Sequence, residues 1–399
     1  MRSTSHASVS LGAGLSCRVA RSSVRVTAIV LACIAASAAA QPPAPSTHAP
    51  TAQEIETSLF LIGDAGHADR PDHPVVWALR EAASGSAARS LILFLGDNAY
   101  PRGLPEKDAP GRATAEVRLN TQVDAARSSG AATIFMPGNH DWGQTRSGGL
   151  EQVRREASYV VERGGGSVRF LPEDGCPGPV TVDVGRSVRL VLLDTQWWLR
   201  KFTEPVHPAS TCPADSEAAV LEALRAAVRG AAGRRVFVAG HHPLESGGPH
   251  GGHFPLVDHL FPLREVKKWL WLPLPIIGSA YPLARQNGIS EQDVSSRAYR
   301  HMRDSLDSVF RDTPPLAFLA GHDHGLQVLS WRSVRHLLIS GSGSYDHNNA
   351  VKRLDGTRYA SAKPGFMRID VLEDGRVRLG VLEVDAGARV TEAFAMWLD

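Results

Sequence analysis

Residues 91–100 read Leu-Ile-Leu-Phe-Leu-Gly-Asp-Asn-Ala-Tyr, an apolar run that ends in a glycine and a group of polar side chains. The same order occurs at 59–66, where Leu-Phe-Leu-Ile precedes Gly-Asp-Ala-Gly. Apolar runs this short are typical of strands that are buried on both faces of a sheet. The glycines allow the backbone to turn sharply where each strand ends.

Further runs of this kind follow, with helix-like stretches between them. This alternation argues for an α/β domain. Near the C-terminus, an Asp-Gly turn at 374–375 between two apolar runs indicates a β-hairpin over 365–384. The expected strands are 59–62, 91–95, 133–136, 188–193, 236–238, 316–319 and 337–339, and the expected helices are 75–83, 118–127, 216–229 and 296–310.

The composition is that of a soluble globular protein with a sizeable core. Of the 399 residues, 43% are hydrophobic and 21% are charged. The formal net charge of +2 is too small to indicate a nucleic-acid or membrane partner by charge alone.

The first 40 residues are expected to be a cleaved signal peptide. Four arginines precede the largely apolar stretch 26–40, which ends in three alanines. This stretch is shorter than the about 20 apolar residues of a membrane-spanning helix, whereas a signal peptide fits it. Lipidation at Cys33 is an alternative, and either route predicts an exported protein, periplasmic or secreted. The Pro-rich stretch 41–55 is then a linker to a single domain over 56–399.

Two cysteines, Cys176 and Cys212, remain after removal of the signal peptide. In an oxidising compartment such an even pair can form a disulfide. Metal binding by these cysteines is less favoured, because neither has a CxxC partner or a nearby group of ligands.

Five polar clusters stand at the ends of predicted strands. Binding sites of α/β sheets form at the carboxyl ends of strands, so the five clusters can converge in one crevice. Their donors are Asp, Asn, His and Tyr, which favour hard or borderline metals such as Fe, Mn or Zn. The donors exceed one coordination sphere and indicate two metal ions that share a carboxylate and can clamp a phosphoryl group. The clusters are Gly63–Gly66, Gly96–Tyr100, Gly138–Asp141, Gly240–Pro243 and Gly321–His324.

These clusters read GDAG, GDNAY, GNHD, GHHP and GHDH, and in this order they resemble the motifs of the calcineurin-like metallophosphoesterases. Among these, the chain is most similar to the purple acid phosphatases of the small, tartrate-resistant type, over about residues 57–345. The resemblance implies a metallophosphoesterase-type α/β/β/α sandwich, with two mixed sheets flanked by helices. It also implies hydrolysis of phosphate monoesters by a metal-bound hydroxide at a dinuclear Fe(III)–M(II) centre.

The choice of subtype depends on Gly66 and Tyr100. Most members of the superfamily have a metal-binding histidine where this chain has Gly66. The resemblance implies that Tyr100 supplies the missing ligand, as a phenolate bound to Fe(III). It assigns the ferric ion to Asp64, Asp97, Tyr100 and His324, and the divalent ion (Fe, Zn or Mn) to Asp97, Asn139, His241 and His322, with His242 behind the ligands.

Two histidines resemble those that face the substrate in this family. His140 would stabilise or protonate the leaving group, and Asp141 could orient its ring. His250 lies nine residues after His241 and resembles the second substrate-facing histidine, but His253 is a rival for that place.

Three functions remain open. The first is a phosphomonoesterase with an acidic optimum, acting on a small phosphorylated substrate. The second is a phosphodiesterase or pyrophosphate-cleaving enzyme that uses the same metals. The third is a non-catalytic exported metal-binding protein.

The segment 254–297 is longer than the corresponding part of the small relatives. Within it, the apolar stretch Trp269–Leu283 contains three prolines, which exclude a regular helix. A loop packed on the domain, a peripheral membrane contact through 269–283 and a lid over the substrate are all compatible with this sequence.

Overall fold

The computed structural model describes residues 49–144, 147–200, 212–214, 216–265, 270–274, 277–344 and 350–399. Residues 50–399 form one compact unit. The predicted signal peptide, Cys33 and most of the predicted linker lie outside the described residues. Among the helices of the described part, none has both the length and the apolar character needed to cross a membrane.

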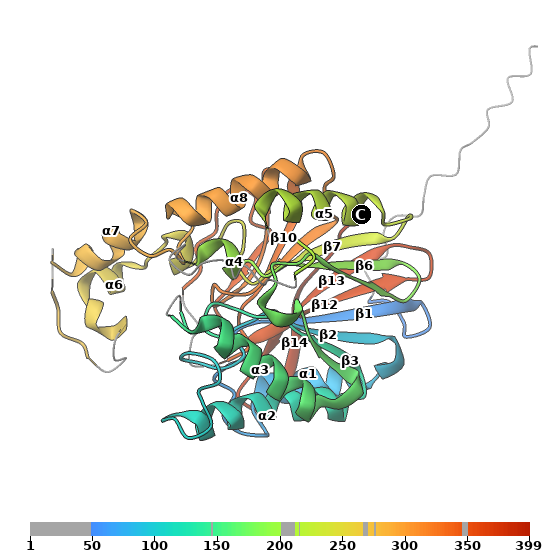
Figure 1. Cartoon of the computed structure of the whole chain (residues 1–399), viewed down its shortest axis with the longest axis horizontal. Helices are drawn as coiled ribbons and strands as arrows, with labels where there is room; N and C mark the ends of the chain where they lie inside the picture. The colour runs from blue at the N-terminus through green and yellow to red at the C-terminus, as the bar shows by residue number, and fades with distance from the viewer. Residues whose placement is uncertain are drawn as a thin grey trace, which may run out of the picture. The chain divides into compact units, whose positions relative to one another are not determined.

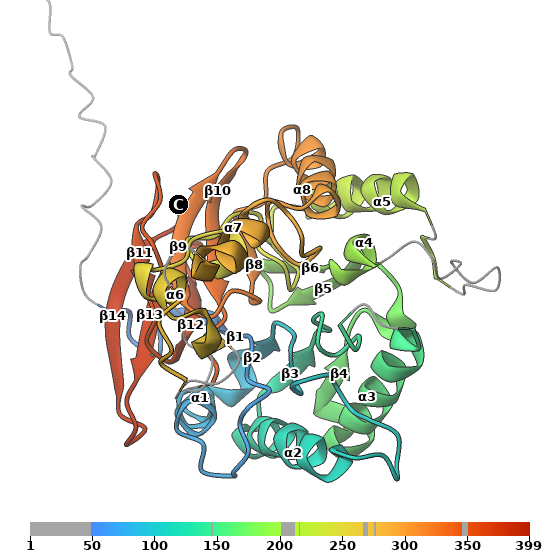
Figure 2. The same cartoon turned by 90° about the vertical axis from the view of Figure 1, so that its left-hand side faces the viewer.

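Seven strands make up the first sheet: β1 (Ile55–Ile62), β2 (Ser90–Phe94), β3 (Ala132–Phe135), β4 (Val168–Phe170), β12 (Gly365–Leu372), β13 (Val377–Val384) and β14 (Val390–Trp397). Their order is β14-β13-β12-β1-β2-β3-β4, which Figure 2 shows from left to right. Strands β1 to β4 are parallel, whereas β12 pairs with β1 antiparallel, so the sheet is mixed.

The second sheet also has seven strands: β5 (Val180–Val184), β6 (Val188–Leu192), β7 (Arg235–Ala239), β8 (Ala317–Ala320), β9 (Leu326–Trp331), β10 (Val334–Ser340) and β11 (Tyr359–Ser361). Their order is β11-β9-β10-β8-β7-β6-β5. Strands β6, β7, β8 and β10 are parallel, and β5, β9 and β11 are antiparallel to their neighbours.

Helices cover the outer faces of both sheets. Figure 1 shows α1, α2 and α3 below the strands and α5 and α8 above them. Short 3₁₀ turns occur at 87–89, 165–167, 173–175, 249–251, 262–265 and 277–279. The α-helices are α1 (Pro74–Ser84), α2 (Arg112–Ser129), α3 (Gly149–Gly164), α4 (Gln196–Leu199), α5 (Glu217–Arg229), α6 (Leu256–Leu260), α7 (Ala280–Gln286) and α8 (Arg297–Phe310).

Alternate side chains of each strand lie in different apolar layers, because successive side chains point to opposite faces of the sheet. Leu59 and Leu61 of β1 belong to the same buried cluster as Leu190 and Phe237 of the second sheet. Phe60, between them in sequence, joins a cluster with residues of α1, α2 and α3. A third cluster joins the second sheet to α5 and α8. These layers confirm the predicted α/β/β/α sandwich.

The predicted strands, helices and C-terminal hairpin are present, but some ends differ. Strand β1 begins at Ile55 instead of at position 59, because the segment 55–58 also pairs with β12. Helix α2 begins at Arg112 instead of at position 118. Helix α3 was not predicted, since it is preceded by Gly148 and has no Ser, Thr, Asp or Asn at its N-cap.

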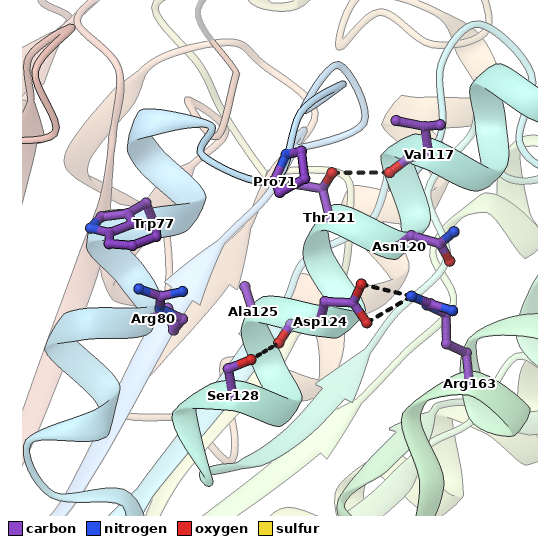
Figure 3. A pocket seen from close by; sticks show the side chains of 10 residues that line it. All are labelled: Pro71, Trp77, Arg80, Val117, Asn120, Thr121, Asp124, Ala125, Ser128 and Arg163. Atoms are coloured by element: carbon purple, nitrogen blue, oxygen red, sulfur yellow. Dashed lines mark hydrogen bonds and ion pairs between the residues drawn. The ribbon is translucent and has the colours of Figure 1, made fainter.

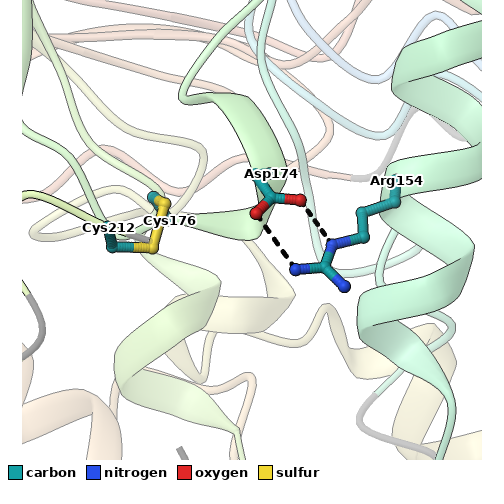
Figure 4. Close-up of a disulfide and its surroundings, with 4 residues drawn as sticks. All are labelled: Arg154, Asp174, Cys176 and Cys212. Carbon is teal, nitrogen blue, oxygen red and sulfur yellow. Dashed lines mark hydrogen bonds and ion pairs between the residues drawn. A yellow bond between two sulfur atoms is a disulfide. The ribbon is translucent and has the colours of Figure 1, made fainter. Parts of the chain in front are cut away.

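The disulfide between Cys176 and Cys212 is present. Figure 4 shows it beside an ion pair between Arg154 of α3 and Asp174, whose Nε and Oδ1 atoms are 2.6 Å apart. The bond closes a loop between residues 36 positions apart in the sequence. It therefore restricts the unfolded chain.

The insertion contains two short helices, α6 and α7. The prediction that prolines exclude a regular helix from 269–283 is wrong for its last residues, because α7 begins at Ala280. Pro282 lies in the first turn of α7, where a missing N–H breaks no helical hydrogen bond.

Candidate metal centre

The five polar clusters follow parallel strands of both sheets, at the ends where the two sheets meet. The Asp64 N–H donates to the Gly96 carbonyl oxygen over 3.0 Å, which joins the loops after β1 and β2. The Gly63 N–H donates to the Ser340 carbonyl oxygen of the second sheet over 2.7 Å. A Cβ atom added to Gly63 would lie only 3.0 Å from the Cα atom of Gly321. The loops of the two sheets are therefore in direct contact.

Three residues predicted to hold the ferric ion form one polar group. The Tyr100 hydroxyl donates to Asp64 Oδ1 over 2.9 Å and lies 3.0 Å from His324 Nε2. His324 Nε2 is itself 3.4 Å from Asp64 Oδ1. A phenol oxygen, a carboxylate oxygen and an imidazole nitrogen thus face one another.

The residues predicted to hold the divalent ion form a second group around Asn139. Its Oδ1 atom is 3.1 Å from both His241 Nε2 and His322 Nδ1. His241 Nε2 is also 3.4 Å from Asp97 Oδ1. Asp64, Asp97 and His241 each have a ligand atom within 4.8 Å of the others, so Asp97 lies between the two groups. The structure brings all seven predicted ligands together.

Backbone carbonyl oxygens orient two of the histidines. His241 Nδ1 donates to the Leu95 carbonyl oxygen over 2.7 Å, and His322 Nε2 donates to the Gln292 carbonyl oxygen over 2.9 Å. Because a carbonyl oxygen only accepts, each neutral ring carries its proton at these nitrogens. The opposite nitrogens, which face Asn139, keep a lone pair for a metal ion, as is common around histidine ligands.

His242 makes a different set of contacts. Its Nδ1 atom is 2.8 Å from Thr195 Oγ1, and its Nε2 atom is 2.8 Å from Gln292 Oε1. Ligand atoms of His241, His242 and His322 lie within 4.8 Å of one another, so His242 adjoins the centre. Both of its ring nitrogens have polar partners, in line with a place behind the ligands. Burial, followed by the neighbouring His241, lowers the pKa of His242 well below its usual value.

Three of the predicted ligands have left-handed backbone conformations. The φ angles are 59° at Asp64, 56° at Asp97 and 68° at His322. Such conformations cost about 1–3 kcal/mol each and gather at functional sites.

Close packing of two loops requires glycine at position 66. A Cβ atom on Gly66 would lie 2.6 Å from the Asp97 carbonyl oxygen and 2.8 Å from the Ala99 nitrogen. A histidine at this position would therefore collide with the backbone of the loop after β2. The hydroxyl of Tyr100, from that same loop, lies among the donors instead.

The expectation that Asp141 orients His140 is wrong. The buried Asp141 carboxylate accepts hydrogen bonds from the backbone N–H groups of Asp97 (2.9 Å), Asn98 (2.9 Å) and Gly138 (2.7 Å). It therefore ties together the loops after β2 and β3. Burial and the nearby Asp97 carboxylate raise the pKa of Asp141 to about 7.

His140 is oriented by backbone instead. Its Nδ1 atom donates to the Pro101 carbonyl oxygen over 2.7 Å, and its Nε2 atom is 3.8 Å from Asp97 Oδ2. The ring packs edge-on against Tyr100, with the ring centres 4.4 Å apart. Burial lowers the pKa of His140, and Asp97 only partly opposes this effect. The lowered pKa favours a neutral ring.

The charges at the centre suit a cation. Burial and then the carboxylates of Asp64 and Asp97 raise the pKa of Tyr100 well above its usual value. Burial opposes ionisation of Asp97, but His241 and His140 outweigh it and lower its pKa. Burial also opposes protonation of His241, yet Asp97 raises its pKa to about 9, so this ring would release a proton on binding a metal ion. Two buried carboxylates beside phenol, amide and imidazole donors fit hard or borderline metal ions.

A cavity of about 490 Å³ adjoins the centre, and Asn139, His140 and His250 are among the residues that line it. His253 lines a different cavity, of about 370 Å³. Of the two rival histidines, His250 is the one beside the predicted ligands. Its Nδ1 atom is 3.0 Å from Asp293 Oδ1.

Three residues of the insertion take part in the site and were not predicted: Arg285, Gln292 and Asp293. The Arg285 Nε atom donates to Asp293 Oδ2 over 2.7 Å, and Arg285 also lines the cavity. Burial opposes ionisation of Asp293, but Arg285 outweighs it and lowers the pKa of Asp293. No sequence motif marks these residues, because their contacts arise only when the insertion folds back on His250 and His322.

No protein-family model matches the sequence, and no curated protein matches it. Solved structures do. GAP50, the anchor in the inner membrane complex of Plasmodium, has a TM-score of 0.50 and 12% identity, over 87% of this chain and 89% of that chain. A purple acid phosphatase from yellow lupin (Lupinus luteus) seeds has a TM-score of 0.51 and 10% identity, over 86% of this chain and 53% of that chain. A dimetal phosphatase from Danio rerio matches at 14% identity over 86% of this chain and 99% of that chain, but its TM-score of 0.47 gives it no weight.

These likenesses show the fold. The two mixed sheets with outer helices match the fold of these structures, and the structural neighbours include a purple acid phosphatase. This chain spans about half the length of the lupin chain. At such low identities a common fold does not establish a common activity, so the chemistry depends on the site.

Proposed function

We propose that this protein is an exported acid phosphatase that hydrolyses phosphate monoesters at a dinuclear metal centre. The observation that carries the proposal is the cluster of seven donor side chains from five separate loops. In this proposal Asp64, Asp97, Tyr100 and His324 bind Fe(III), and Asp97, Asn139, His241 and His322 bind a divalent ion (Fe, Zn or Mn). When bound, the two ions would neutralise phosphoryl oxygens and activate water.

Gly66 and Tyr100 support the ferric assignment. The backbone leaves no room for a side chain at position 66, and the Tyr100 hydroxyl lies 2.9 Å from Asp64. A phenolate is a strong donor to Fe(III) and produces a visible charge-transfer band.

His140 and His250 are the proposed substrate-facing groups. Both line the cavity beside Asn139. The Pro101 carbonyl oxygen holds the proton of His140 at Nδ1, so Nε2 is the atom that would meet the phosphate or the leaving group. Asp293 holds His250 in the same way through Nδ1. A histidine in this position can donate a proton to the departing alkoxide once Nε2 is protonated as well, which acidic pH favours.

Iron content and the visible spectrum test the metal assignment. We expect a coloured protein that contains iron, and loss of the band in Tyr100→Phe. Tyr159→Phe is the matched control, because the Tyr159 hydroxyl bonds Asn120 on the outer helix α2. A colourless, active protein with two Mn or Zn ions would reject the ferric ion while leaving the phosphoesterase proposal intact.

Substrate comparison tests the reaction. We expect faster hydrolysis of an aryl phosphate than of a bis-aryl phosphate, with a maximum rate at acidic pH. The reverse preference would favour the alternative of a phosphodiesterase or pyrophosphate-cleaving enzyme. A rate maximum well above neutrality would argue against an acid phosphatase.

A non-catalytic role is the remaining alternative. GAP50 is described as an anchor, so the fold does not by itself require catalysis. The complete set of donors favours an enzyme here. A purified protein that binds no metal and hydrolyses neither substrate would favour the binding role.

Export and domain boundaries complete the proposal. Residues 1–40 would be a signal peptide and 41–55 a linker, with one domain over 56–399. The Cys176–Cys212 disulfide supports an oxidising compartment. N-terminal sequencing of the mature protein would distinguish cleavage after residue 40 from lipidation at Cys33.

A further inference from the structure

Large apolar side chains on the surface are concentrated in the insertion. Among the residues that the structure describes, twelve such side chains are exposed, and eight of them lie between positions 256 and 289. Single exposed apolar residues are common, but a concentration of them marks an interaction surface. The apolar patch is defined by its six most exposed members: Leu256, Trp271, Leu272, Ile277, Leu283 and Ile289.

The apolar patch belongs to a part of the domain that protrudes. Figure 1 shows α6 and α7 beyond the ends of the sheets, and these helices pack on each other and on the adjoining turns. The Phe261 and Trp271 rings are 5.2 Å apart, and the Leu274 N–H donates to the Leu260 carbonyl oxygen over 2.8 Å. An apolar protrusion of this kind can enter a bilayer interface, whereas a small ligand is normally bound in a concave site.

The chemistry of the segment suits an anionic lipid surface. Trp271 and Tyr281 are exposed, and both residue types favour the boundary between apolar chains and headgroups. Between α6 and α7, the sequence 261–279 carries three basic residues and one acidic residue, although the whole chain is close to neutral. Arg285 is not counted, because it forms an ion pair with Asp293. A local excess of positive charge attracts anionic headgroups.

We propose that the apolar patch binds the surface of an anionic lipid bilayer. The patch is continuous with the cavity beside the metal centre, because its member Ile289 lines that cavity together with His140 and His250. Bilayer binding would hold the cavity at the membrane surface. The substrates would then be phosphate monoesters carried by lipids, a consequence that rests on the proposed function.

Co-sedimentation with vesicles tests the binding. The probes are vesicles of phosphatidylcholine with phosphatidylglycerol, and vesicles of phosphatidylcholine alone. We expect the processed protein to bind the anionic vesicles more strongly. The triple variant Leu256→Ser, Leu272→Ser and Ile277→Ser should lower the vesicle partition coefficient by about a thousandfold, since burying each side chain contributes about tenfold.

A matched control removes exposed apolar side chains elsewhere. Trp77, Val117 and Val161 are exposed on α1, α2 and α3, and Figure 3 shows Trp77 and Val117 beside a groove between α1 and α2. Replacing these three residues with serine should leave vesicle binding unchanged. Equal loss of binding in both triple variants, or no loss in either, would overturn the proposal.

The oligomeric state separates a lipid surface from a second copy of the chain. If wild type fails to bind vesicles and is a dimer by light scattering, while the patch variant is a monomer, the patch is a protein interface and the proposal is wrong. We expect wild type and the patch variant to have the same oligomeric state by light scattering.

Two activity assays separate this proposal from the proposed function. The patch variant should hydrolyse a soluble aryl phosphate as fast as wild type, which also shows that it folds. It should lose most of its activity on a phosphatidic acid in vesicles. Vesicle binding without hydrolysis of either substrate would refute the phosphatase function but not the membrane contact.

Discussion

Gly66→Ala tests the packing of the loops around the metal centre. The added Cβ atom would lie 2.6 Å from the Asp97 carbonyl oxygen, about 0.8 Å short of the 3.4 Å at which ordinary contacts begin. It would also lie 2.8 Å from the Ala99 nitrogen. Both neighbours are backbone atoms, so no side chain can rotate away. The loop after β2 must therefore shift by about this distance.

The shift would displace Asp97 and Tyr100, which this loop carries. Overpacking of a buried site costs about 1–3 kcal/mol of stability. A displacement of about 1 Å in a catalytic arrangement can reduce the rate about a hundredfold. We expect kcat/KM on an aryl phosphate to fall about a hundredfold in Gly66→Ala, and the visible band to weaken.

The assay measures iron content, absorbance and aryl phosphate hydrolysis for Gly66→Ala and for Gly166→Ala. The control is matched, because an added Cβ atom on Gly166 has no heavy atom within 4 Å. Urea unfolding should show the loss of about 1–3 kcal/mol only for the first variant. Full activity and full iron content in Gly66→Ala would refute the claim that backbone contact excludes a side chain at this position.

Replacing Cys176 and Cys212 with serine should lower the free energy of unfolding by about 4 kcal/mol, because the bond joins residues 36 positions apart; urea unfolding under non-reducing conditions measures this. Burial raises the pKa of Asp194 from 3.8 to about 7, so the folded protein holds an extra proton between these values and loses stability as pH rises through them. The free energy of unfolding of Asp194→Asn, relative to that of wild type, should therefore rise by up to about 4 kcal/mol between pH 4 and pH 8. The same difference between variant and wild type at both pH values would contradict this. His241→Ala should abolish binding of the divalent ion in calorimetric titration, whereas His242→Gln should weaken it about 10- to 100-fold, since a supporting contact is lost instead of a ligand.

The strands and the order of the motifs could be predicted from local sequence. Runs such as 91–95 are apolar throughout because both faces of each central strand are buried, here between the second sheet and the outer helices. The glycine after each run marks the end of a strand. The segments 112–117 and 149–164 were harder to predict, because each directly follows a glycine, a residue typical of turns.

The role of Asp141 shows where local sequence misleads. Its position next to His140 predicted that it orients the imidazole. In the folded protein the carboxylate instead accepts hydrogen bonds from four backbone N–H groups, three of which come from the loop after β2. Adjacent residues can point in different directions, so neighbours in sequence need not interact.

By itself, the sequence determined which donor types are present and at which strand ends they stand. It also determined that glycine occupies position 66, where most related motifs have histidine. Only the tertiary structure showed why glycine is needed there: the backbone of the loop after β2 occupies the space that a side chain would need. It also decided that His250, and not His253, borders the metal centre, and that the Gln292 carbonyl oxygen orients His322. The physical reason is that residue type and spacing are local properties, whereas these contacts join segments distant in the sequence and form only when both sheets and the insertion pack together.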